Sequence, residues 1–216
     1  VNETQEFIEI AFDFSNPLDL VREAISNSFD YKATEMRIGF ETITDCGEKV
    51  LKITLEDNGQ GMNLDGLQSF FDLGNSMSHG DVEKIGEKGH GTKVYLNCKS
   101  IYVETQKDGK IYKAFMDKPK RKLHNREIPT VQVEEHMAET KESFTKITVL
   151  GYNNNRRDKF THANVKDYIT WFTKMGSIER EFGIDKNKNV KLYLKGIDVD
   201  EYEEIEFGHV FPEESI

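Results

Sequence analysis

REAISNSFD, residues 22–30, places a carboxylate and a side-chain amide on one side of an expected helix. At about 100° per residue, Glu23, Asn27 and Asp30 fall within about 60° of one another. The apolar residues of the segment spread over the other side, where they would pack on a core. Taken alone, this pattern is typical of the solvent-exposed side of an amphipathic helix. Its meaning therefore depends on the motifs that follow it.

Two glycine motifs follow this helix along the chain. DNGQGM, residues 57–62, comes directly after an expected hairpin, and its glycines permit close approach of the backbone to a ligand. By itself it is also compatible with an ordinary Asp-Asn-Gly turn. IGEKGHGTK, residues 85–93, places three glycines ahead of a helical stretch. Free backbone N–H groups and the helix dipole at such a position can bind phosphate.

The order and spacing of these motifs carry more information than any one of them. ExxxN on a helix, DxGxG after a hairpin and GxxGxG after a long loop resemble the GHKL ATPases, which include gyrase B, the large heat-shock chaperones, histidine kinases and MutL. The resemblance covers about residues 17–150. Residues 22–30 look most like the chaperone and MutL branch, and LGNSMS at residues 73–78 followed by residues 85–93 looks like MORC proteins.

The resemblance implies the Bergerat fold. This is an α/β (α+β) two-layer sandwich, with a mixed, mostly antiparallel sheet covered by helices on one face. We expect one domain over residues 1–216, with the core motifs in residues 17–150, a lid at residues 73–91 and an extension at residues 151–216. The first residue, Val1, is not methionine, which suggests a piece of a longer protein.

The resemblance also implies a site for ATP and Mg²⁺. Glu23 would be the general base that activates the attacking water, and Asn27 would ligate Mg²⁺. Asp57 would accept a hydrogen bond from the adenine N6 amine, a readout that a guanine carbonyl could not satisfy. The further expected nucleotide contacts are Gly59, Gly61, Met62, Ser76, Gly86, Lys88, Gly89, His90, Gly91, Thr92, Lys93 and Thr145, the last in the strand motif SFTKITV.

The expected function is Mg²⁺-dependent binding and hydrolysis of ATP, with lid closure and ATP-dependent homodimerisation acting as a clamp. A switch that binds ATP or ADP without significant turnover is one alternative, and a protein kinase of the histidine-kinase type is another. Glu23 favours hydrolysis, because histidine kinases generally lack a glutamate four residues before the asparagine. The lysine or arginine that touches the γ-phosphate in hydrolysing relatives is expected beyond Ile216, so we expect slow turnover by residues 1–216.

Charge gives little support to a nucleic-acid partner for the chain as a whole. Acidic residues outnumber lysine and arginine by 39 to 29, which gives a net charge of −10. Residues 107–126 are the exception, with eight basic and two acidic residues that include KPKRK at residues 118–122. Residues 196–216 hold eight acidic residues and no lysine or arginine. Such runs usually form solvated surface.

No segment approaches about 18 uncharged apolar residues, and the first thirty residues lack a secretory signal pattern. We therefore expect a soluble, intracellular protein of the cytoplasm with no membrane segment. The two cysteines, Cys46 and Cys98, form neither a CxxC pair nor a disulfide framework.

Periodicity and turn signals predict the order of the elements. We expect helices over residues 17–31, 64–72, 91–98 and 163–174, and strands over residues 6–12, 35–43, 49–56, 100–105, 110–115, 129–134, 144–150 and 190–195. The strands over residues 35–43 and 49–56 form the expected hairpin, with a turn at Asp45-Cys46-Gly47.

Overall fold

The computed structural model describes residues 16–71, 91–176 and 189–206. Eight strands form one sheet in the order β5-β4-β3-β6-β2-β1-β7-β8. The strands are β1 (Glu35–Asp45), β2 (Glu48–Asp57), β3 (Ser100–Lys107), β4 (Lys110–Asp117), β5 (Val131–Met137), β6 (Phe144–Leu150), β7 (Lys191–Lys195) and β8 (Glu203–Glu204). All neighbouring strands run antiparallel except β1 and β7, which are parallel. The expected mixed, mostly antiparallel sheet is confirmed.

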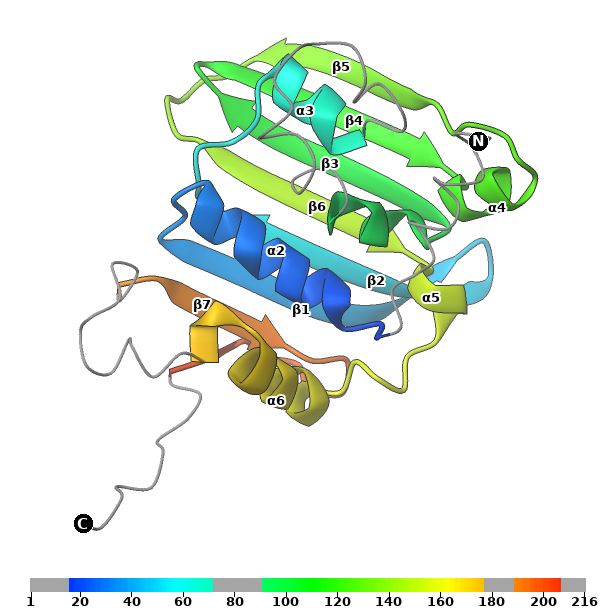
Figure 1. The fold of residues 1–216 in the computed structure, drawn as a ribbon, viewed down its shortest axis with the longest axis vertical. Coiled ribbons are helices and arrows are strands. Elements are labelled where there is room, and N and C mark those ends of the chain that lie inside the picture. Colours follow the sequence, from blue (N-terminus) through cyan, green and yellow to red (C-terminus); the bar gives the residue numbers. More distant parts are fainter. Residues whose placement is uncertain (1–15, 72–90, 177–188, 207–216) are drawn as a thin grey trace, which may run out of the picture.

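Helices form the second layer, in front of the sheet in Figure 1. They are α2 (Asp19–Asp30), α3 (Leu64–Phe71), α4 (Pro119–His124), α5 (Tyr152–Asn155) and α6 (His162–Phe172), with 3-10 helices η1 (Gly91–Leu96) and η2 (Lys174–Gly176). The core lies between the layers, where strand residues such as Phe40 and Ile53 and helix residues such as Leu20 and Ile25 are at most 1% exposed. Burial of this apolar surface holds the two layers together.

The opposite face of the sheet carries a row of side chains that alternate in charge. Consecutive cross-strand partners in one register row are Glu134, Lys113, Glu104, Lys146, Glu56 and Arg37. Lys113 and Glu104 form an ion pair of 3.7 Å, and Lys146 pairs with Glu56. Facing opposite charges stabilise neighbouring strands by about 0.2–1 kcal/mol per pair and leave this face compatible with water. The alternation explains why the helices cover one face and not both.

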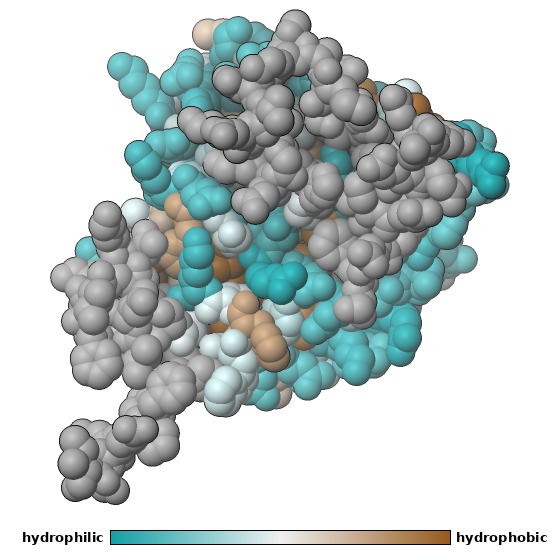
Figure 2. All heavy atoms as spheres, in the orientation of Figure 1, coloured by the Kyte–Doolittle hydropathy of each residue, from teal (hydrophilic) through white to brown (hydrophobic). Residues whose placement is uncertain are grey.

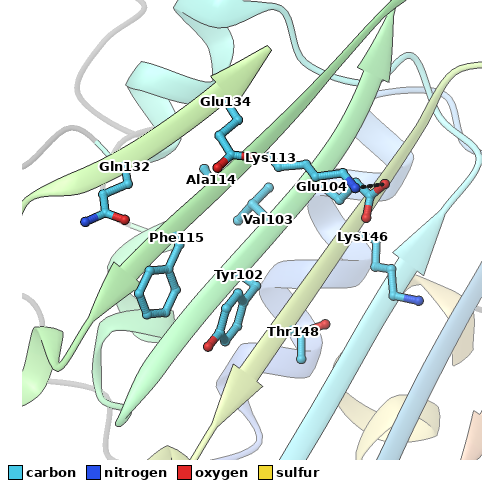
Figure 3. A pocket seen from close by; sticks show the side chains of 10 residues that line it. All are labelled: Tyr102, Val103, Glu104, Lys113, Ala114, Phe115, Gln132, Glu134, Lys146 and Thr148. Atoms are coloured by element: carbon cyan, nitrogen blue, oxygen red, sulfur yellow. Dashed lines mark ion pairs between the residues drawn. The ribbon is translucent and has the colours of Figure 1, made fainter. Parts of the chain in front are cut away.

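A shallow hollow of about 230 Å³ lies on this same open face (Figure 3). Tyr102 and Phe115 stack across β3 and β4 with ring centroids 4.6 Å apart, and both line the hollow. The neighbouring residues Val103 and Ala114 alternate with them and are buried. The hollow is therefore on the far side of the sheet from α2, and it is separate from the site described below.

The hairpin and the first helix illustrate how closely the local predictions match. Asp45 pairs with Glu48, so β1 and β2 are joined by a two-residue turn of Cys46 and Gly47, both with positive φ. This agrees with the expected turn. The helix begins at Asp19 instead of Pro17, because the Asn16 side chain accepts a hydrogen bond from Leu18 N at 3.0 Å and holds a turn before the helix.

Four elements had no clear signal in the sequence, namely α4, α5, η2 and β8. Each has six residues or fewer, which is too short to show a hydrophobic period. The predicted strand at residues 6–12 and the predicted lid at residues 73–91, except Gly91, lie outside the described residues. No helix among the described residues is long and apolar enough to cross a membrane.

Candidate functional site

Glu23 and Asn27 lie one turn apart on α2, as the spacing predicts. The Asn27 side-chain amide donates a hydrogen bond to Glu23 Oε1 at 2.9 Å. Partial burial raises the pKa of the Glu23 carboxyl, and the hydrogen bond from Asn27 opposes that rise. The result is a carboxylate with a fixed orientation and a proton affinity above that of an exposed glutamate.

Gly91, the first residue of η1, packs directly against this carboxylate. A Cβ atom at position 91 would lie 2.1 Å from Glu23 Oε2, closer than any real contact. Any side chain at this position would displace the Glu23 carboxylate. Glycine at this position therefore leaves the Glu23 carboxylate in place and lets the end of the GxxGxG motif lie against the polar side of α2.

Asp57, the last residue of β2, is held by two hydrogen bonds. Its Oδ1 accepts from Gly59 N at 2.8 Å, and its Oδ2 accepts from Ser28 Oγ at 3.1 Å. Burial raises the pKa of Asp57, and these two donors counteract part of the rise. Ser28 follows Asn27 directly on α2. The same helix therefore supplies a hydrogen-bond donor to Glu23 and another to Asp57. Sequence reasoning did not single out Ser28, because its partner is 29 residues away.

The glycine turn after Asp57 packs against β3 and β6. Gly61 has φ +62°, and a Cβ there would lie 2.0 Å from Gln106 O. Met62 N donates to Thr105 Oγ1 at 2.8 Å, and that hydroxyl donates to Phe144 O at 2.9 Å. Thr105 is fully buried, and sequence reasoning missed it. A threonine in a strand that pairs directly with the Thr145 motif is the signal that could have found it.

Thr145 lies beside this contact, with its Oγ1 3.4 Å from Thr105 Oγ1. It pairs with Asp57 across β6 and β2. The predicted residues Asp57, Gly59, Gly61, Met62 and Thr145 thus come together at one end of the central strands.

The short helix η1 and the residue just beyond it carry polar side chains that are buried. Thr92 Oγ1 and Tyr95 OH are buried without a hydrogen-bond partner among the described residues, and so is Asn97 Oδ1 just beyond the helix. Lys93 is also buried, with 6% of its surface exposed. Thr92 and Lys93 were expected near phosphate. Buried polar atoms without partners are uncommon and call for a functional or solvent partner.

Tyr95 is an addition to the predicted site. Its side chain is fully buried and stacks on Phe70 with ring centroids 5.7 Å apart. Burial raises the pKa of Tyr95 well above its usual value, and the nearby negative charge of Glu23 adds to the rise. Tyr95 therefore lies close to Glu23 and packs against Phe70.

Five of the predicted nucleotide contacts lie outside the described residues, namely Ser76, Gly86, Lys88, Gly89 and His90.

The side chains fit a Mg²⁺ ion that is held mainly by phosphate. Asn27 uses its amide nitrogen on Glu23, which leaves its carbonyl oxygen, Oδ1, as an oxygen ligand of the kind that Mg²⁺ prefers. No cluster of three or more His, Cys, Asp or Glu side chains that could hold a metal is found among the described residues. A site with one protein oxygen suits an ion whose other ligands are phosphate oxygens and water.

Comparison with known proteins agrees with the fold and the motif order. Residues 16–148 match the family model described as histidine kinase-, DNA gyrase B- and HSP90-like ATPase. This span is more than half of the chain, and the chain belongs to this GHKL-type ATPase family. Membership supports ATP binding by the domain. A search of curated proteins found no match.

Proposed function

We propose that this domain binds ATP together with Mg²⁺ and hydrolyses the ATP, with Glu23 as the general base. The observation that carries the proposal is the contact of Glu23 with both Asn27 and Gly91. It joins the polar side of α2 to the end of a glycine motif whose backbone N–H groups suit phosphate.

The base-reading part of the proposal rests on Asp57. Ser28 and Gly59 donate to its two carboxylate oxygens and so fix the plane of the group. Each carboxylate oxygen has a second lone pair, which can accept a hydrogen bond from the exocyclic amine of adenine. A guanine carbonyl at the same place would repel the carboxylate. Discrimination follows because a buried acceptor without a donor costs about 1–3 kcal/mol or more.

The catalytic part rests on Glu23. A general base works best when its pKa is close to the operating pH, and burial moves the pKa of Glu23 in that direction. The hydrogen bond from Asn27 holds the carboxylate in one orientation. Asn27 Oδ1 would hold Mg²⁺, which would neutralise charge on the β- and γ-phosphates when bound.

We further propose that nucleotide orders residues 73–91 as a lid and promotes dimerisation of the domain. Support comes from the glycine- and serine-rich composition of this stretch and from the resemblance to GHKL ATPases. The residues of the GxxGxG motif would gain hydrogen bonds to the phosphates of ATP. ADP lacks the γ-phosphate and would therefore order the lid to a smaller extent.

Two measurements on the same preparation test the proposal. Calorimetry with Mg²⁺ should give an affinity for a non-hydrolysable ATP analogue well above that for the GTP analogue, and phosphate release should follow from ATP. Equal affinity for the two analogues would contradict the role of Asp57. Tight ATP binding without phosphate release would favour the switch without turnover, and transfer of phosphate to a histidine would favour the kinase.

A further inference from the structure

One end of the sheet carries a cluster of cations that the ATP site does not use. We call it the basic corner, and it consists of Lys118, Arg121, Lys122 and Arg126 around α4 and Arg156 and Arg157 after α5. Figure 1 shows α4 and α5 at the same end of the molecule, and in Figure 2 the described surface there is hydrophilic.

Tertiary contacts bring these two distant segments together. Lys120 Nζ donates to Asn154 Oδ1 at 2.6 Å, which joins α4 to α5. Both segments are also hydrogen-bonded to the residues between η1 and β3. Lys118 N donates to Lys99 O at 2.8 Å, and Asn153 N donates to Asn97 O at 2.9 Å. These contacts fix the two segments of the basic corner relative to each other.

The basic corner is positive within a chain of net charge −10. Within the described part of the chain, two of its six cations have acidic partners, since Lys118 pairs with Asp117 at 3.2 Å and Arg156 pairs with Asp158 at 3.3 Å. These pairs are exposed and weak. The remaining local excess of positive charge would attract an extended anion.

The apolar residues of α4 point into the protein. Pro119 is buried and Leu123 is 1% exposed, whereas Arg121 and Arg126 are exposed. The helix thus has no apolar side left to insert into a lipid bilayer, as an interfacial helix would need. The side chains that α4 presents to solvent are therefore suited to a charged partner and not to the apolar interior of a bilayer.

The backbone at the corner is held in uncommon conformations. Lys118 and Arg126, on either side of α4, have φ of +48° and +60°, and Asn153, Asn154 and Asn155 are also left-handed. These are five of the eight non-glycine residues with positive φ among the described residues. Such conformations cost free energy and persist where the surrounding structure imposes them. They fix the directions in which the basic side chains leave the surface.

We propose that the basic corner binds the phosphate backbone of duplex nucleic acid. Arginine supplies a planar fork of donors that matches phosphate oxygens, and three of the four arginines have no ion pair among the described residues. Contacts of this kind are independent of base sequence and release counterions. Binding is therefore weakened steeply by salt.

The test compares two charge reversals of equal size. The double variant Arg121→Glu/Lys122→Glu reverses two charges of the basic corner and keeps the hydrogen bond from Lys120 to Asn154. Lys107→Glu/Lys141→Glu is the control, because Lys107 ends β3 at the far end of the strand from α4 and Lys141 lies beyond β5. Anisotropy of a labelled DNA duplex is measured without ATP between about 50 and 200 mM salt, so the outcome does not depend on the proposed ATPase activity.

Wild type and control should bind the duplex, with log affinity falling steeply against log salt. The basic-corner variant should bind at least about tenfold more weakly at low salt, with a slope shallower by about two. Its circular dichroism and melting temperature should match those of the control. The proposal is overturned if wild type does not bind at low salt, if both variants lose affinity equally, or if anionic lipid vesicles bind through the same residues as tightly as DNA.

Discussion

Asn27 donates a hydrogen bond to Glu23 Oε1 across one turn of α2, at 2.9 Å. The amide therefore uses its nitrogen to orient the carboxylate and keeps its oxygen for another partner. The two residues have different proposed roles. Glu23 accepts a proton, and Asn27 presents a neutral oxygen to Mg²⁺. They can be separated experimentally.

Glu23→Gln should abolish turnover and preserve binding. Glutamine retains an oxygen that can accept from Asn27, so the packing against Gly91 should persist, but the amide cannot accept a proton from water. We expect nucleotide affinity within a few-fold of wild type and a fall in the single-turnover rate of about 10²–10⁴-fold. Glu104→Gln, on the open face of the sheet, is the matched control and should change neither quantity. Full turnover by Glu23→Gln would show that the base is another group.

Asp57→Asn should weaken nucleotide binding without lowering the stability of the fold at neutral pH. Burial raises the pKa of Asp57 in the folded state, so the fold binds this proton more tightly than the unfolded chain does. Its contribution to stability is then fully present at low pH and is lost as pH rises through the folded-state pKa. At neutral pH the substitution should leave the melting temperature unchanged or raise it, while affinity for ATP falls strongly.

The same pKa sets the pH dependence of binding. The proposed hydrogen bond from adenine needs the ionised carboxylate of Asp57, so ATP affinity in wild type should decline as pH falls through the raised pKa of this group. Calorimetry over an acidic pH series would measure the decline. An affinity for ATP that does not change over that series would contradict the role of Asp57 as acceptor.

Thr105→Val should weaken both the fold and the pocket. Valine has the shape of threonine but cannot accept from Met62 N, which would leave that buried N–H without its partner. The cost should be about 1–3 kcal/mol in the free energy of unfolding, measured in urea, together with reduced ATP affinity. Thr148→Val, on the open face, should cost much less. Equal losses for the two variants would mean that the Thr105 hydroxyl is not a structural acceptor.

Tyr95→Phe should not destabilise the protein, because the Tyr95 hydroxyl has no partner among the described residues. Tyr168→Phe is the contrast, since Tyr168 OH donates to Asp19 Oδ1 at 2.7 Å, and its removal should cost about 1 kcal/mol or more. Urea unfolding of both variants gives the comparison. A loss for Tyr95→Phe as large as that for Tyr168→Phe would show that a buried water or a residue outside the described ones satisfies the hydroxyl.

Local pattern was enough to predict the parts of the site that one element supplies. The four-residue spacing of Glu23 and Asn27 put both on one side of α2, and the hairpin and its turn followed from alternation and from Cys46-Gly47. The family followed from the order of three motifs, and the match over residues 16–148 confirms it. Periodicity reports such relationships because helices and tight turns join residues that are close in sequence.

Contacts between elements were decided by the tertiary structure. Ser28 meets Asp57, Thr105 meets Met62, and Gly91 meets Glu23 because the sheet register and the packing of α2 and η1 bring them together. The same holds for the charge row on the open face and for the contact of Lys120 with Asn154. A strand shifted by one residue would send each of its side chains to the other face without changing any local pattern. The sequence by itself thus determined which groups are available on each element, and strand register and layer packing decided which of them touch.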